Sequence, residues 1–434
     1  MFPLPDLPPI DVQRELAAMR ADLRAIRAQM QDGWLDEERA RHVRQVVEDA
    51  LADSATRASF LEKEWDAGYS AGEGGGAYFR ARDGSATMRV SGMVQARFVA
   101  ASAYGPDAPS TPQANSRWGF EAKTIFVAFA GQVVDPSVTY VAVIAYTSQT
   151  NRFIVVPGAY RVPYASIRKG LDERTGISVG QLNVPWDLES DYLGSSTLTT
   201  GDYSIFNYRF GAGKNPGVVV DHTGDWLRAT AGAFNQLGTV SPGWDSLTNL
   251  SFCVAARAEA KWGVDWSDIA GMSRPGADPL GLVLGLGGCM SNGRAQNPQP
   301  PGSLVTPSAQ GFTADARLLL HRATLIAQYA YMRDPVGGTE LGWYQGVNIQ
   351  ASGFVAPDLE PFVEACWMGN VPVEWIAQAG VNWYAGSSRV KVTLKSVVPF
   401  GGGNVNGIRS IAGGLGIAAM DNNASFVAQM QLKF

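Results

Sequence analysis

Charged side chains alternate with small apolar residues along many segments of this 434-residue sequence. In residues 251–262, Arg257, Glu259 and Lys261 share one face of an extended chain, while Phe252 and Trp262 lie near the two ends of the other face. Rows of charge of this kind can attract and sort ions. The basic residues predicted to line an ion path in this way are Arg89, Arg97, Lys123, Arg257, Lys261, Arg317, Arg389, Lys391 and Lys395.

The same pattern allows a second interpretation. Each inward base could pair with an inward acid, such as Glu121, Glu259, Asp315, Glu364 or Glu374, and the wall would then be polar but only weakly selective. We favour this paired wall, and retain a mild anion preference as the alternative.

Residues for covalent or metal chemistry do not gather in the sequence. His42, His222 and His321 are scattered, which leaves no general base beside a nucleophile. The three cysteines are also far apart and form no CxxC motif, so they predict neither a disulfide scaffold nor a zinc site. We therefore expect no catalytic residue, no metal and no cofactor, and the protein is not predicted to be an enzyme.

Sixteen segments between residues 86 and 434 alternate with a period of two. One face is rich in alanine, with aromatic residues toward the strand ends at Phe98, Trp118, Trp262 and Phe434. In 117–130 this apolar face is predicted to include Trp118, Phe120, Ala122, Phe126 and Ala128. The even count and the alternation of short and long connections predict an all-β transmembrane barrel of sixteen antiparallel strands, in which 424–434 pairs back to 86–100. No run of 18 apolar residues suggests a membrane-spanning helix.

The N-terminal region has a different period. Apolar residues recur in steps of four and three, which is a heptad pattern, at Val12, Leu16, Met19, Leu23, Ile26 and Met30. Glu15 and Arg20, like Asp22 and Arg27, are spaced as pairs that join neighbouring helices, so a parallel coiled coil of three or four chains is predicted. The alternative is one amphipathic helix lying on a domain.

The predicted domains are therefore a proline-rich lead and coiled coil over 1–33, a second helix and glycine linker over 34–76, and the barrel over 77–434. Residues 1–74 carry 9 Lys and Arg against 15 Asp and Glu, out of 35 and 40 in the whole chain. The remaining 26 basic and 25 acidic residues leave the barrel nearly neutral, which argues against nucleic acid as a partner.

Two stretches resemble the phosphate-selective porin O and P family. Residues 170–200, with Val179-Gly180-Gln181-Leu182, resemble that family's VGQFKxPF strand and the loop that follows, and residues 45–61 resemble the N-terminal region of planctomycete-type relatives. The resemblance implies an outer-membrane barrel, a homotrimer, and a third outer loop folded inward as a constriction, here about 186–215. The charged residues of that loop are Asp187, Glu189, Asp191, Asp202, Arg209 and Lys214. Because acids outnumber bases in the loop, phosphate specificity is not expected to carry over.

These observations predict a trimeric outer-membrane porin for passive diffusion of small hydrophilic solutes or ions, with its N-terminal helices in the periplasm. Its expected partners are outer-membrane lipid, a second and third copy of the chain, and the solutes themselves. The alternative is a structural envelope protein whose coil tethers the outer membrane to the cell wall or to other envelope proteins.

Overall fold

The computed structural model divides into two compact units, Met1–Trp65 and Asp66–Phe434. It describes residues 20–22, 24, 65–70, 75–103, 116–146, 160–191, 197–235, 252–269, 271, 280–292, 309–333, 343–369, 375–385, 389–400 and 423–434. In the first unit Arg20, Ala21, Asp22 and Arg24 are helical and exposed, and the six predicted core positions of the coiled coil lie outside the described residues.

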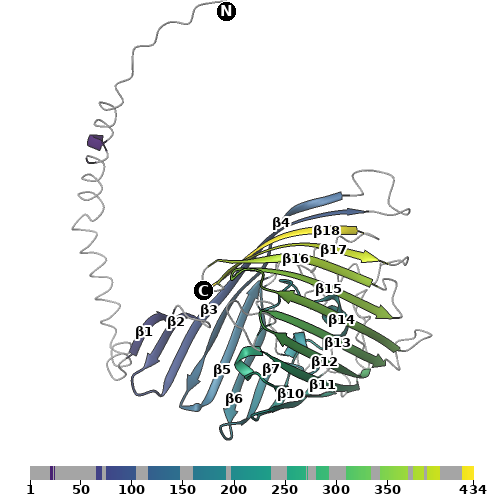
Figure 1. Ribbon diagram of the computed structural model, residues 1–434. Helices are drawn as coiled ribbons and strands as arrows, with labels where there is room; N and C mark the ends of the chain where they lie inside the picture. The colour runs from purple at the N-terminus through teal and green to yellow at the C-terminus, as the bar shows by residue number, and fades with distance from the viewer. Residues whose placement is uncertain are drawn as a thin grey trace, which may run out of the picture. The chain divides into compact units, whose positions relative to one another are not determined.

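The second unit is built on a closed ring of sixteen antiparallel strands (Figure 1). Each strand pairs with the next in sequence, and β18 pairs with β3 to close the ring. The strands of the ring are β3 (Ala86–Ala103), β4 (Ser116–Val133), β5 (Asp135–Tyr146), β6 (Tyr160–Gly170), β7 (Thr175–Asn183), β8 (Lys214–Thr223), β9 (Leu227–Phe234), β10 (Phe252–Trp262), β11 (Gly281–Asn292), β12 (Ala309–Leu320), β13 (Ala323–Arg333), β14 (Trp343–Gly353), β15 (Leu359–Gly369), β16 (Trp375–Ala385), β17 (Val390–Phe400) and β18 (Asn423–Lys433). The predicted sixteen-stranded ring is confirmed.

Alternation of side chains explains why these segments form a ring. In β10 every second residue from Cys253 to Glu259 is buried inside, and the residues between them are exposed. β18 follows the same rule, with Phe426, Met430 and Leu432 outside and Gln429 and Gln431 inside. A ring of such strands leaves no free edge and separates an apolar outer face from a polar interior, which we call the lumen.

One predicted face is wrong in its second half. The β3–β4 register shifts between Gln95 and Ala96, because Lys123 is an extra residue in β4. Beyond this bulge, Phe126 pairs with the inward Met93 and Ala128 pairs with Ser91, so both face the lumen instead of the outer surface. A one-residue bulge reverses the alternation, and strict counting by two could not detect it.

The predicted end of the second helix and the glycine linker are also wrong where the structure describes them. Residues Trp65–Ser70 form strand β1, and Gly76–Ala81 form strand β2. β2 pairs with β1 and with the first half of β3. Gly68 and Gly76 therefore lie in strands, where their lack of a side chain admits close neighbours. A Cβ on Gly68 would meet the Tyr78 ring 2.8 Å away.

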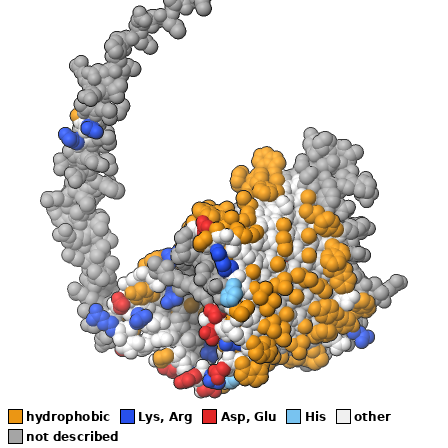
Figure 2. All heavy atoms as spheres, in the orientation of Figure 1, with side chains coloured by type: hydrophobic (Ala, Val, Ile, Leu, Met, Phe, Trp, Pro, Cys, Tyr) orange, Lys and Arg blue, Asp and Glu red, His pale blue; other side chains and the backbone are white. Residues whose placement is uncertain are grey.

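Large apolar side chains cover much of the outer face (Figure 2). Trp118 and Phe120 are 76% and 83% exposed, and their rings pack against Phe98 at centroid distances of 6.3 and 5.1 Å. Trp262 and Phe434 are exposed on the same outer face, as predicted. No helix among the described residues is long and apolar enough to cross a membrane.

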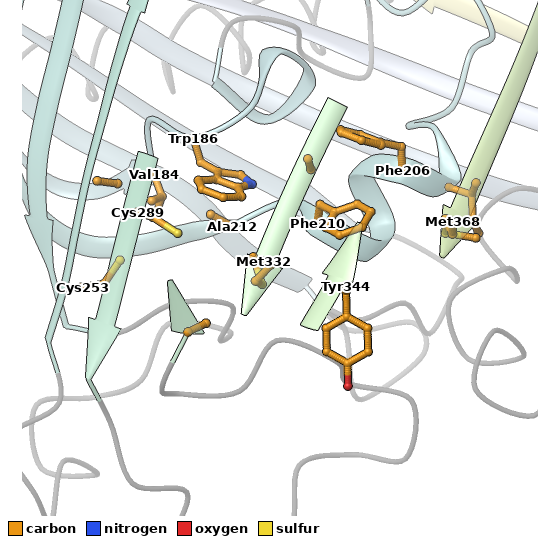
Figure 3. Close-up of a cluster of buried hydrophobic side chains, with 14 of the residues drawn as sticks. Val184, Trp186, Phe206, Phe210, Ala212, Cys253, Cys289, Met332, Tyr344 and Met368 are labelled. Atoms are coloured by element: carbon orange, nitrogen blue, oxygen red, sulfur yellow. The ribbon is translucent and has the colours of Figure 1, made fainter. Parts of the chain in front are cut away.

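The main apolar cluster lies inside the ring, not on the outer face (Figure 3). It joins Trp186, Phe206 and Phe210, from the segment between β7 and β8, to buried residues of the wall such as Cys289 and Met332. A barrel whose interior holds a packed segment needs this second, internal core, because a polar wall alone cannot bury the apolar side chains of the segment.

Candidate functional site

Residues 184–191 and 197–213, between β7 and β8, fold into the lumen, and we call them the inserted segment. It contains two short helices, α5 (Leu188–Asp191) and α6 (Ile205–Phe210). Ser204 caps α6, because its side-chain oxygen accepts a hydrogen bond of 3.0 Å from the Asn207 amide. The predicted constriction loop, 186–215, therefore corresponds to this segment, with Lys214 and Asn215 already in β8.

The first anchor of the inserted segment is on β11 and β12. The Thr313 hydroxyl donates a hydrogen bond of 2.6 Å to the backbone carbonyl of Trp186. This close approach requires Gly287, because a Cβ there would overlap the same carbonyl oxygen. The Trp186 ring also lies over Gly311, within 3.0 Å of where a Cβ would be. Two wall glycines thus create the space for one tryptophan.

A second anchor is apolar. Phe206 and Phe210 pack with their ring centroids 5.1 Å apart, and both are buried. The Phe210 ring lies over Gly346 of β14, 2.5 Å from where a Cβ would be. As Figure 3 shows, both rings come from α6, and they belong to the same apolar cluster as Met368 and Tyr344 of the wall.

The third anchor is electrostatic and centres on Asp202. Its carboxylate forms salt bridges with Arg97, at 3.3 Å, with Lys395, at 2.7 Å, and with Lys123. Burial would raise the pKa of the Asp202 carboxyl, but the charges of Lys123, Lys395 and Arg97 hold it well below its usual range. Asp202 is therefore ionised whenever the segment is in place.

Amines and amides of β16–β18 and β4 hold the backbone before Asp202. The Lys391 amine donates to the Leu198 carbonyl at 2.7 Å, and Asn382 donates to the Thr199 carbonyl at 2.8 Å. Lys395 donates to the Thr200 carbonyl at 3.0 Å, and Lys123 donates to the Gly201 carbonyl at 2.5 Å. These donors fix an extended stretch that has no helix or sheet of its own.

Glu189 forms the opposite end of this network. Its carboxylate accepts hydrogen bonds from the Ser204 amide at 2.8 Å and from Gln328 of β13 at 3.1 Å. Burial, together with the nearby charge of Asp187, raises the pKa of Glu189 to about 7. Asp187 itself accepts a hydrogen bond of 2.7 Å from Asn207. The inserted segment thus carries Asp202, held by three cations, and Glu189, for which the described residues supply no salt bridge.

Part of the β10–β11 connection also turns into the lumen, at the end of the barrel where the short turns lie. The β10–β11 connection contains a 3-10 helix, Trp266–Ile269. Val264 and Ile269 pack on the inward residues Val283 and Leu319. Lys261 donates to the Val264 carbonyl at 2.6 Å, and Arg317 donates to the Ile269 carbonyl at 2.6 Å. These two bases therefore hold a turn against the inner wall.

Two ion-pair groups lie on the wall. Arg257 donates two hydrogen bonds to Asp315, at 2.7 and 2.9 Å, and also pairs with Glu259 at 3.1 Å. Arg228 pairs with the other oxygen of Glu259 at 2.5 Å. These groups are almost fully buried, so they contribute little free charge to the lumen.

The second group is more open. Arg168 of β6 donates two hydrogen bonds to Asp221 of β8, at 3.0 and 2.6 Å, across Gly176 of β7. The side chains of Arg168 and Asp221 are 37% and 26% exposed. Inward residues of β5 and β6, such as Thr139 and Ser166, are also only half-buried. The described part of the inserted segment therefore covers this side of the lumen less than the side formed by β11–β18.

The predicted site residues thus have several positions. Arg97, Lys123, Lys391 and Lys395 hold the inserted segment, Arg257 lies in the wall pairs, and Lys261 and Arg317 hold the inward turn. Arg389 donates to the Tyr69 hydroxyl at 2.8 Å and to the Ser70 carbonyl, which connects it to β1. Arg89 is exposed near the start of β3. The side chains of Asp191 and Arg209 lie outside the described residues.

Sequence reasoning missed Arg168, Asp221 and Arg228. Each lies at an inward position close to one end of its strand, where few residues beyond it continue the alternation. Gly176 is the feature of the sequence that could have indicated the pair of Arg168 and Asp221. An inward glycine on the strand between β6 and β8 leaves room for the Arg168 side chain to reach across β7 to Asp221.

No protein-family model matches the sequence, and no curated protein sequence matches it. Solved structures do. Salmonella typhi OmpF, solved in complex with daunomycin, is 14% identical, with 81% of this chain and 98% of that chain covered and a TM-score of 0.53. OmpT of Vibrio cholerae, an outer membrane protein folded in vitro and solved in a trimer form, is 13% identical, with 81% and 100% covered and a TM-score of 0.50. The chain therefore shares the sixteen-stranded barrel fold of these outer-membrane proteins.

Proposed function

We propose that the protein is an outer-membrane porin that lets small hydrophilic solutes or ions diffuse passively. One observation carries the proposal: a closed ring, apolar outside and polar inside, holds an inserted segment that is clamped to its inner wall by Asp202, Trp186 and α6. A clamped segment narrows a pore without closing it, so its side chains can set pore size and charge preference.

The outer face supports placement in a membrane. Aromatic and aliphatic side chains there are exposed, and water would not favour so large an apolar surface on a monomeric protein. Short turns such as His321–Arg322 lie at one end of the ring, as periplasmic turns do, and the N-terminal residues enter the ring from that end through β2 and β3. A periplasmic location of the N-terminal helices would follow.

The pairing of wall cations favours weak selectivity over a strong anion preference. Lys123 and Lys395 neutralise Asp202, and Arg257 is shared between Asp315 and Glu259. A mild anion preference stays a prediction. Assembly as a homotrimer is supported by the trimer form of the Vibrio cholerae protein of the same fold. A passive channel of this kind needs no catalytic residue, so the protein is proposed not to be an enzyme.

Planar-bilayer recording tests the proposal. The full chain, refolded in detergent and added to a lipid bilayer, should produce discrete current steps of uniform size. A reversal potential near zero in a salt gradient is expected for weak selectivity. If circular dichroism shows that the protein is folded and it still produces no current steps, the proposal of a channel is contradicted.

A further inference from the structure

Oxygen atoms gather in one patch of the inner wall, under the inserted segment. Gln350 of β14, Glu364 of β15 and Gln378 of β16 are direct cross-strand partners in the register. Directly paired residues place their Cβ atoms about 5 Å apart on the same face. Gln328 of β13 joins this patch through its hydrogen bond to Glu189. All of these residues are more than nine-tenths buried.

Several of these oxygens have no hydrogen-bond partner. They are Oε2 of Glu364 and the side-chain oxygens of Gln328, Gln350 and Gln378. Two amide orientations are fixed when the carboxyl groups are ionised, because an ionised carboxylate only accepts hydrogen bonds. The Gln328 amide nitrogen faces Glu189, and the Gln378 side chain is hydrogen-bonded to Glu364, so each amide must present its oxygen elsewhere.

The two carboxylates also lack a cation. Glu189 and Glu364 interact electrostatically with each other, and no salt bridge of either is found among the described residues. Lys395 is near Glu364, but it is already bonded to Asp202 and to the Thr200 carbonyl. Two buried carboxylates and three unpartnered amide oxygens repel one another and would be costly without a positive charge between them.

We propose that Glu189, Glu364, Gln328, Gln350 and Gln378 form a binding site for a calcium ion, which ties the inserted segment to β13–β16. Calcium accepts six to eight oxygen ligands in a flexible arrangement and combines carboxylates with amide carbonyls, whereas magnesium demands stricter geometry. The donor set contains only oxygen, which disfavours zinc and copper. Cys366 is close by, but its thiol is turned to the backbone of Phe206 and packs in the apolar cluster.

Calorimetric titration tests the site directly. The full chain, refolded in detergent and stripped with a chelator at pH 8, should bind about one calcium ion per chain, and calcium should raise its melting temperature. Magnesium should bind at least tenfold more weakly. Binding should also weaken at pH 6, because a proton on Glu189 competes with the metal.

Matched variants give the decisive comparison. Glu364→Gln keeps the size and the hydrogen bond to Gln378 but removes the charge, and should weaken calcium binding at least tenfold. Glu173→Gln makes the same chemical change on an exposed turn and should leave binding unchanged. If Glu364→Gln fails to fold, Gln350→Leu removes one ligand and should also weaken binding.

A wild-type chain that binds no calcium at pH 8, or variants at positions 364 and 350 that bind as tightly as the wild type, would overturn the site. Both outcomes are measured without current, so they are independent of whether the protein conducts.

Discussion

The backbone carbonyl oxygen of Trp186 lies against the α-carbon of Gly287, in the space that any other side chain would need. The position of Trp186 therefore depends on the absence of a side chain at Gly287. Residues of the wall therefore determine the position of the inserted segment as much as the segment's own sequence does.

Gly287→Ala should displace the inserted segment. Overpacking of this kind costs about 1–3 kcal/mol, and the loosened segment should give a larger and noisier single-channel conductance. Gly288→Ala is the matched control, because a Cβ there meets only the Gly311 carbonyl oxygen at 3.9 Å. Equal conductance in the two variants would show that Trp186 does not position the segment.

Asp202→Asn should remove the carboxylate charge that Arg97, Lys123 and Lys395 share. Removing one partner of a buried ion pair costs about 3–5 kcal/mol, so the melting temperature should fall. Arg97 also pairs with Glu121, so Lys123 and Lys395, which lose their salt bridge to Asp202, should shift the reversal potential toward anion preference. Asp225→Asn, on an exposed turn where the carboxylate pairs with Arg174, should change neither quantity.

Asp202 also predicts behaviour in acid. Its folded pKa is depressed, so the stability it contributes is fully present above its ordinary pKa of 3.8 and is lost only as pH falls through the lower folded value. Titration of Asp202 should therefore leave the conductance of the wild type unchanged down to about pH 4. This prediction is contradicted if the current noise of the wild type changes near pH 5 and Asp202→Asn abolishes that change.

Glu189 predicts a change at neutral pH. Its pKa is raised by burial to about 7, so the folded state favours the protonated form. The stability linked to this proton is present below the ordinary pKa of 4.5 and is lost as pH rises through 7. In chelator, cation permeability relative to anion permeability should rise between pH 6 and pH 8, and Glu189→Gln should remove that rise. A wild type whose permeability ratio is flat over this range would contradict the assignment.

Arg168 and Asp221 should tune ion preference with opposite signs. Both are partly exposed to the lumen, where one unit charge changes the energy of a nearby ion by about 0.5–1 kcal/mol in water. Arg168→Gln should therefore favour cations roughly two- to fivefold, and Asp221→Asn should favour anions. Arg174→Gln removes the same charge from an exposed turn and serves as the control. If Arg174→Gln shifts the reversal potential as much as Arg168→Gln does, the path of the ions through the lumen does not run along β6.

Phe434→Ala should lower the yield of folded protein. The Phe434 ring covers Gly92, and its backbone exchanges hydrogen bonds of 2.7 and 3.0 Å with that residue. Leu432→Ala removes a neighbouring outward side chain of similar exposure that covers no glycine, so it should cost less. Pores that do assemble should conduct normally, since both side chains point away from the lumen.

Alternation could be predicted from sequence because it repeats over strands of about ten residues. The ring, its count and the outward faces of β10 and β18 follow from this repetition alone. A single irregular residue such as Lys123 breaks the repetition, so counting by two places Phe126 on the wrong face. β1 and β2 were missed because six-residue strands with glycine resemble a linker.

The site was harder to predict because its partners come from distant strands. An inward arginine or lysine is recognisable, but whether it faces water, an acid or a backbone carbonyl depends on where the inserted segment lies. Lys391 shows this, since its partner is the carbonyl of Leu198, a group that every residue carries. The sequence indicates inward charge, and only the fold shows how that charge is used.

Strand β3 accepts two partners end to end along one edge. β18 pairs with Met93–Ala103, Phe434 bonds to Gly92, and β2 pairs with Thr87–Val90, which leaves Ser91 between them. β18 therefore cannot slide toward β2 by even one two-residue step. The offset between the first and last strands sets the stagger of a barrel, and the stagger sets its diameter. By blocking β18 on β3, β2 therefore helps to fix the diameter of this barrel.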